Sequence, residues 1–334
     1  MGRIRAFPGV KVVLFPISVL LLLSGCQQDN DQQSAEEPLR FEKILFESAP
    51  SQVIDTFQGQ LAAIKPFFEI FNEEIIQIGP DSLAGYPAAL ESFTKDPILL
   101  SVYLDINKNW PALSEQIKLL KRSLNKMEQQ LGIESPTLVT YLSGFNESFI
   151  TLPGMLGLGL DKYLGSVYPY YQELGIPEYI RIRMNPDHLA TDGLKAWLMS
   201  EMEPPEPGAT FLDHLIYQGK IHYLLNHYLR GVPGHLHFHF SQQQLKWCRE
   251  HEREMWKFLA ENRILFSTDR MTIRKYHEDA PFTKDFGNES PGKTGCWIGF
   301  RIVQGYLKAT RQDPGVLLTN VSSQTILAES RYRP

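Results

Sequence analysis

Histidine is the residue type in this sequence that most directly suggests chemistry. The chain has nine histidines, and seven of them lie between positions 214 and 251. Neutral imidazole is a common zinc ligand, and bound zinc lowers the pKa of water until the water can attack a peptide bond. A zinc-dependent hydrolase is therefore the first hypothesis to test on the spacing of His214, His222, His227, His235, His237, His239 and His251.

The spacing argues against a zinc peptidase. The helical peptidase motif needs His, Glu and His at positions i, i+1 and i+4, so that two imidazoles converge on the metal. His251 and Glu252 supply its first half, but Met255 stands in place of the second histidine, and a thioether is a poor zinc ligand. The three histidines from His235 to His239 alternate, which predicts one polar face of a strand. We expect no physiological metal and no cofactor.

Two further positions could carry chemistry. Lys220 follows Gly219 in a helical pattern, where glycine costs about 1 kcal/mol relative to alanine, so this helix is expected to pack closely against another backbone. Held in an apolar setting, Lys220 could have a lowered pKa and act as a base or amine nucleophile, whereas most such lysines extend to solvent. Asp161 and Tyr163 could bind a ligand at the end of a strand, whereas a carboxylate that caps a turn is the simpler interpretation.

A turn-rich stretch over residues 280–299 leads into an amphipathic helix near the C-terminus. Its glycines could hold an anion at the start of the helix, but their spacing is not that of a nucleotide-binding loop. We predict a packed turn in which Gly295 and Gly299 let the helix approach a neighbouring element closely. The defining residues of this stretch are Ser290, Pro291, Gly292, Gly295, Trp297 and Gly299.

The elements that must position these residues are mainly helical. The clearest is an amphipathic helix over 113–131, whose apolar positions alternate in steps of four and three. Short apolar runs between 137 and 183 predict strands of a small sheet, and 105–109 is predicted to be a loop and helix cap. Further helices are predicted over 41–46, 51–71, 82–93, 212–230 and 244–258. The fold class is therefore α+β and mainly helical.

The N-terminus has the organisation of a secretory signal peptide. Basic residues precede a short apolar run, and two small residues stand directly before Cys26. Residues 1–25 resemble a bacterial lipoprotein signal, which implies cleavage and acylation of Cys26, and several acyl chains on one residue give stable anchoring to a membrane. Residues 26–38 are expected to form an acylated, disordered tether, because the segment after Cys26 is polar and acidic.

The net charge of the chain limits the partners that we expect, and its cysteines limit the covalent chemistry. Removal of the signal peptide takes the basic residues from 33 to 30 against 38 acidic ones, a formal charge of -8 with neutral histidines. Such a chain has no electrostatic attraction for nucleic acid. Cys248 and Cys296 remain in the folded part, and we expect two buried free thiols rather than a disulfide.

Dispersed motifs along the chain carry a family resemblance. They are the lipobox, Phe145 with 159–165, Tyr217 with 219–221, Trp247 and Cys248 with Glu252 and Trp256, 267–269, 280–282, 290–292, Gly295, 297–299, Ile302, Val303, Tyr306 and 330–334. In this order they resemble the gliding motility lipoprotein GldB family of the Bacteroidota. The resemblance implies a cell-envelope lipoprotein at the periplasmic face, required for gliding, linked to type IX secretion and partnered by envelope proteins of that machinery. It implies no known reaction.

The chain is also similar, more remotely, to gluzincin zinc-dependent peptidases. This similarity implies a degenerate zincin-like domain over 39–334, with a helical lobe over 39–136 and a peptidase-like lobe over 137–334. It places the zinc helix at 212–225, where Ile216, Tyr217 and Lys220 replace the ligands and the base. It also places the strand that ends at Asp161 beside a peptide substrate, so that a binding groove survives without catalysis.

The resulting hypotheses differ in chemistry. The preferred one is a non-catalytic, peptidase-like lipoprotein that binds a protein or cell-wall component, with no catalytic or metal-binding residue. An alternative is an active metallohydrolase with atypical ligands, of which His214, His222 and His251 are the candidates. A third is a structural assembly subunit without a groove.

Overall fold

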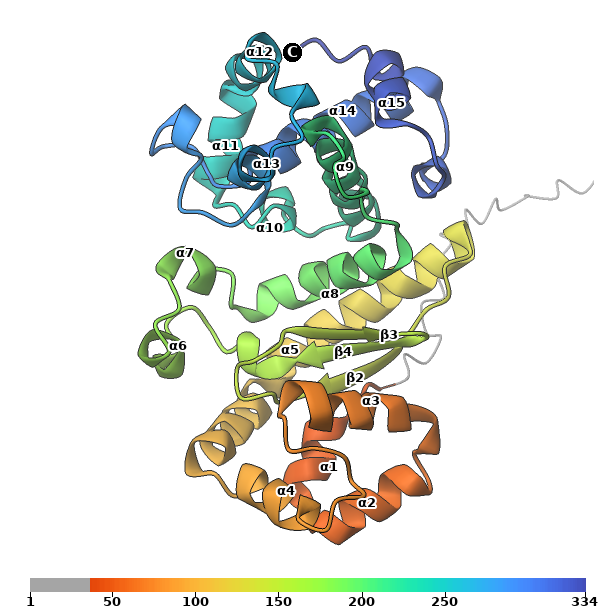
Figure 1. Ribbon diagram of the computed structural model, residues 1–334, viewed down its shortest axis with the longest axis vertical. Helices are drawn as coiled ribbons and strands as arrows, with labels where there is room; N and C mark the ends of the chain where they lie inside the picture. Colours follow the sequence, from red (N-terminus) through yellow and green to blue (C-terminus); the bar gives the residue numbers. More distant parts are fainter. Residues whose placement is uncertain (1–36) are drawn as a thin grey trace, which may run out of the picture. The chain divides into compact units, whose positions relative to one another are not determined.

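The computed structural model describes residues 37–334, which form many helices around one small sheet (Figure 1). The predicted signal peptide, Cys26 and all but the last two residues of the tether lie outside the described residues. Within the described part, no helix is both long and apolar enough to cross a membrane. The mainly helical α+β class is confirmed.

Three of the four strands of the sheet lie where short apolar runs predicted them, and the first strand, near the start of the described residues, was not predicted. Its strands are β1 (Leu39–Arg40), β2 (Thr137–Tyr141), β3 (Phe149–Leu152) and β4 (Met155–Gly159), in the order β1-β2-β4-β3. β1, β2 and β4 run parallel, and β3 pairs antiparallel with β4 through a tight hairpin. Strand β4, which leads to Asp161, is therefore interior, whereas β3 forms one edge of the sheet. The expectation that β4 lies beside a peptide substrate is wrong, because both of its edges are already hydrogen-bonded.

Alternating side chains of the strands face two separate cores. Val139, Tyr141 and Ile150 join a core rich in phenylalanine with α1 (Phe41–Glu47) and its neighbours, α2 (Pro50–Gln58), α3 (Lys65–Ile70) and α4 (Tyr86–Thr94). Leu156 and Leu158 face the other way, toward α5 (Pro97–Leu131) and α8 (Pro186–Glu201). The single helix predicted over 51–71 is interrupted at Gly59, so that α3 packs on the sheet through Phe67 and Tyr141, whereas α2 packs through Phe57 on α1 and α3.

Helix α5 is longer than predicted, and the loop expected over 105–109 is wrong. Asp96 caps its first turn by accepting hydrogen bonds from the amides of Ile98 and Leu99, and Pro97 occupies the first helical position, where proline is tolerated. Ile106 is fully buried on the same apolar face as Leu113, so burial continues the helix through the polar segment.

The C-terminal half is a helical layer built around α9 (Phe211–Tyr228) and α14 (Thr294–Thr310), which cross at two glycines. A Cβ on Gly219 would overlap the carbonyl group of Gly299, and a Cβ on Gly299 would overlap the Leu215 carbonyl. The close approach predicted for Gly219 and Gly299 is confirmed. Gly295 is different, because a Cβ there would press on the Tyr276 carbonyl of α13 (Arg270–His277) rather than on α9.

The predicted strand with alternating histidines is wrong. His235 and His237 lie in the one-turn helix α10 (Gly234–His237), and His239 follows in the left-handed region with φ 57°. The remaining helices are α6 (Pro169–Glu173), α7 (Glu178–Arg181), α11 (Gln242–Glu250), α12 (Glu252–Glu261) and α15 (Ser323–Ser330). Single turns lie at Ala62–Ile64, Phe71–Ile75, Leu160–Lys162, Ile264–Phe266, Lys284–Phe286 and Pro314–Leu318.

Candidate functional site

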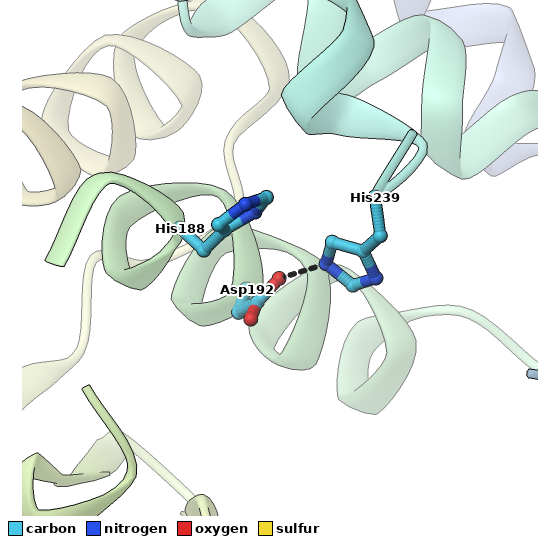
Figure 2. A group of neighbouring side chains, drawn as sticks. All are labelled: His188, Asp192 and His239. Carbon is cyan, nitrogen blue, oxygen red and sulfur yellow. Dashed lines mark hydrogen bonds and ion pairs between the residues drawn. The ribbon is translucent and has the colours of Figure 1, made fainter. Parts of the chain in front are cut away.

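Three side chains of ligand type converge between α8 and the loop after α10. His188 and Asp192 stand four residues apart on α8, so they lie on one face of the helix, and His239 reaches them from the loop (Figure 2). Their potential ligand atoms all lie within 4.8 Å of one another. The ring centroids of His188 and His239 are 5.4 Å apart.

Hydrogen bonds fix the tautomer of His239. Its Nδ1 lies 3.1 Å from the Nη1 of Arg183 and 3.1 Å from the Nζ of Lys293, and its Nε2 bonds to Asp192 (Figure 2). Protonated arginine and lysine side chains only donate, so Nδ1 must accept. Nε2 therefore carries the ring proton and donates a hydrogen bond to the Asp192 carboxylate. Burial lowers the pKa of His239 well below 6.5, and the neighbouring cations lower it further, so the ring is neutral.

The two cationic side chains beside His239 both form ion pairs with one carboxylate. Asp279 pairs with both Arg183, at 2.7 Å, and Lys293. Burial opposes ionisation of Asp279, but Lys293 and Arg183 outweigh it and hold its pKa below the usual range. Burial lowers the pKa of Lys293 to about 8. Tyr163 donates to Asp192 at 3.0 Å, and burial raises the pKa of that carboxyl group.

The donor set does not fit a catalytic zinc ion. Two neutral imidazoles and a carboxylate are suitable ligands, and Nδ1 of His188 is buried without a hydrogen-bond partner. In the tautomer inferred above, however, Nε2 of His239 is a donor, and reversing the tautomer would point Nδ1–H at two cationic donors. Leu189 is fully buried where a zinc-peptidase helix carries its catalytic glutamate.

Asp192 and His239 of the cluster line an open cleft of about 430 Å³. Phe149, Ile176, Ile180 and Met199 provide apolar wall, and Tyr163 and His239 provide polar groups. A second hollow of about 390 Å³ shares Arg183, Lys195, Met199 and His239 with the first. Lys195 borders both hollows and makes no ion pair within residues 37–334. The site therefore combines an apolar wall, a neutral imidazole held by the Asp192 carboxylate, and Lys195 as a cation without an ion pair among the described residues.

Comparison with known proteins decides the family. A family model described as gliding motility protein GldB matches residues 26–334. The chain belongs to the GldB family. No curated protein and no solved structure matches it, so no known structure supports the zincin-like similarity.

The GldB motif residues fall in several places rather than in one site. Asp161 is fully buried and accepts hydrogen bonds from the amides of Ser143 and Phe145, at 3.1 and 2.6 Å, as a turn-capping carboxylate does. Tyr163, two residues later, borders the cleft and orients Asp192. Asp161 therefore has a structural role, whereas Tyr163 belongs to the cleft.

Tyr217 and Lys220 lie together in a different cleft of about 900 Å³, bordered by residues 201–209 and 317–323. The Nζ of Lys220 donates to the Thr319 carbonyl at 3.4 Å, and burial lowers its pKa. Helix α9 therefore does not supply the cluster of ligand-type residues. That cluster uses α8, which the gluzincin comparison did not select.

The turn-rich stretch has a packing role and also contributes one residue to the site. The Oγ of Ser290 donates to the Thr283 carbonyl and accepts from the Thr283 amide, each at 3.1 Å. The Pro291 carbonyl accepts from the same threonine at 3.0 Å, and Gly292 fits closely against Ala280. These bonds hold Lys293, with φ 55°, where its ammonium reaches His239.

The histidines proposed for zinc do not converge. His222 stacks on Phe238 with ring centroids 4.6 Å apart, and His251 stacks on Trp247 at 4.3 Å. His214 lies 6.4 Å from the ring of His277 instead.

Glu252 of the half-motif is structural. It accepts from Trp297, Arg301 and Tyr332, and so links α12 to α14 and the C-terminal segment. The buried thiols of Cys248 and Cys296 are free, as predicted.

Sequence reasoning considered His239 but missed His188, Asp192, Arg183 and Lys195. The i, i+4 spacing of His188 and Asp192 in a segment that follows the strands was an available signal. The contributions of Arg183 and Lys195 had no comparable signal, because they depend on contacts far along the chain.

Proposed function

We propose that this GldB-family protein is a lipid-anchored, non-catalytic, peptidase-like binding or assembly component of the cell envelope, required for gliding and linked to type IX secretion. Its partners are other envelope proteins of that machinery. Its binding site is the cleft bordered by Tyr163, Lys195 and His239.

The observation that carries this proposal is the occupation of both ring nitrogens of His239. Nε2–H donates to the Asp192 carboxylate, and Arg183 and Lys293 donate to Nδ1. A general base needs a free lone pair, and a zinc ligand needs a deprotonated nitrogen directed at the metal. This arrangement supports an oriented binding surface and leaves neither nitrogen of His239 free to act in hydrolysis.

The second candidate is an active zinc-dependent hydrolase with atypical ligands. The convergence of His188, Asp192 and His239 within 4.8 Å favours it over the set His214, His222 and His251. Against it stand the tautomer of His239 and the apolar Leu189.

Zinc analysis separates the two candidates. The full-length lipoprotein, extracted in detergent and dialysed against zinc, is expected to hold no stoichiometric zinc that depends on His188. Stoichiometric zinc in the wild type that is lost in His188→Ala, but kept in His251→Ala, would overturn the non-catalytic proposal.

Motility supplies the cellular test. Because His188 Nδ1 makes no hydrogen bond, a strain carrying His188→Ala is expected to glide and to secrete a type IX reporter normally. A strain that lacks the protein is expected to lose both gliding and reporter secretion. Normal secretion in the deletion strain would refute the link to type IX secretion.

A further inference from the structure

Strand β3 leaves a row of backbone groups open at the edge of the sheet. The amide of Gly159 donates to the Ser148 carbonyl at 2.8 Å, and Ile150 lies opposite Gly157. In an antiparallel pair the residues alternate between facing the partner strand and facing away from it. The N–H and C=O groups of Phe149 and Thr151 therefore point away from β4, and they have no partner within the described chain.

This open edge borders the cleft described above. Ser148 and Phe149 line the cleft on the side of the sheet, and Ala196 and Met199 of α8 line it on the helical side. Thr151 is exposed next to them. Edge strands in monomeric proteins are usually covered, charged or kinked, because open groups pair readily with another extended chain. Because Phe149 lines the cleft, an extended segment paired with the outward groups of β3 would have one end in the cleft.

The charge of the cleft selects the chemistry of its occupant. Asp279 pairs with both Arg183 and Lys293, and the Asp192 carboxylate accepts from the neutral side chains of Tyr163 and His239. With Lys195, three cations therefore face two carboxylates, and one positive charge is left uncompensated. Lys195 remains as the cation at the junction of the two hollows, without an ion pair among the described side chains. A carboxylate is its natural complement, since desolvation beside an apolar wall strengthens a charge-assisted hydrogen bond.

We propose that the cleft binds an extended, carboxylate-bearing polypeptide, which adds as a further strand to β3 and places its carboxylate on Lys195. This inference rests on the non-catalytic binding function proposed above and specifies its ligand. Main-chain bonds to Phe149 and Thr151 provide affinity, Phe149, Ile176 and Ile180 contact alternate side chains, and Lys195 selects the acidic group.

Labelled hexapeptides of alternating threonine and valine test the proposal by fluorescence anisotropy with the full-length lipoprotein in detergent. One has a free C-terminal carboxylate, one is amidated with an internal aspartate, and one is amidated without any acid. At least one carboxylate-bearing peptide is expected to bind ten times more tightly than the neutral peptide, and the better of the two shows whether a chain end or a side chain is used. Equal binding of all three, or no binding, would overturn the proposal.

Charge reversal tests the role of Lys195. Lys195→Glu is expected to weaken binding of the preferred acidic peptide at least tenfold, whereas Lys246→Glu, on an exposed position of α11, is expected to leave it unchanged. Equal affinities of the two variants for the peptide would show that Lys195 does not contact its carboxylate and would contradict the proposal.

Backbone pairing has its own matched pair of variants. Thr151→Pro removes an outward N–H without breaking a bond to β4, and Thr151→Val keeps that N–H. Thr151→Pro alone is expected to weaken binding tenfold at an unchanged melting temperature. If the melting temperature does change, amide hydrogen exchange of the wild type with and without peptide tests strand addition instead. Bound peptide must slow exchange of the Phe149 and Thr151 amides. Absence of that protection would refute strand addition, whereas the zinc measurement tests the non-catalytic function separately.

Discussion

At the scale of single residues, burial keeps several histidines neutral in the folded chain. His222 is 2% exposed, and neither of its ring nitrogens has a partner within residues 37–334. Burial lowers its pKa well below 6.5, and that of His277 to about 3. Both rings are therefore neutral in the folded chain at neutral pH, and each is more readily protonated after unfolding.

The free energy of unfolding is expected to decrease at acidic pH because of these buried histidines. As the pH falls below 6.5, the unfolded chain binds protons that the folded chain refuses, so the free energy of unfolding decreases down to about pH 3, where His277 is protonated in the folded state too. His222→Leu is expected to reduce this loss by up to about 1.4 kcal/mol per pH unit and to stabilise the chain by about 1 kcal/mol at pH 7. Urea unfolding between pH 4 and pH 7 measures both effects, and parallel pH profiles of variant and wild type would contradict them.

Asp161 offers a direct choice between a structural and a ligand-binding carboxylate. Its Oδ2 receives two amides and the Ser143 hydroxyl in a buried turn where Phe145 has φ 65°. Asp161→Ala is expected to cost roughly 3 kcal/mol in urea unfolding, because buried donors lose their acceptor, whereas Asp161→Asn keeps an acceptor and costs less. A stable Asp161→Ala protein with impaired gliding would favour the ligand-binding role instead.

At the scale of elements, the crossing of α9 and α14 depends on two glycines in contact. Alanine at position 299 would gain up to about 1 kcal/mol of helix propensity but would overlap the Leu215 carbonyl, which cannot move without separating the helices. Gly299→Ala is therefore expected to lower the free energy of unfolding by about 2 kcal/mol. Gly234→Ala is the control, since a Cβ there would make only an ordinary contact with Leu245. Equal stabilities of the two variants in thermal or urea unfolding would show that the crossing has room.

Helix limits show where local signals suffice. Asp96 and Pro97 start α5, and Gly132, with φ 72°, ends it, all by local backbone chemistry. The polar run around Asp105 was predicted to interrupt this helix. It does not, because Ile106 is buried in the core and Tyr168 donates to Asp105 at 2.8 Å from a distant segment.

At the scale of the whole molecule, attachment to a membrane is expected to depend on Cys26, which lies outside the described residues. Cys26→Ala is expected to move the protein from the membrane fraction to the soluble fraction, because the acyl chains expected on that cysteine provide the anchor. Cys248→Ala, at a buried free thiol, is expected to leave the protein in the membrane fraction. Immunoblots of fractionated cells measure the outcome, and retention of the Cys26→Ala protein in membranes would require another anchor.

The sequence by itself determined what depends on neighbours along the chain. Apolar periodicity located the helix over 113–131 and the helix of Gly219, short apolar runs located the sheet, and ordered motifs indicated the family. These signals suffice because helix and strand burial repeat every few residues.

Only the tertiary structure decided the order of the strands and the composition of the site. Strand order left β3 rather than β4 at the edge, which no local pattern specifies. The tautomer of His239 depends on Asp192, which lies 47 residues away in sequence, and on Lys293, which lies 54 residues away. Such contacts form where separate elements pack, and the chemistry of an imidazole follows from the groups that packing places beside it.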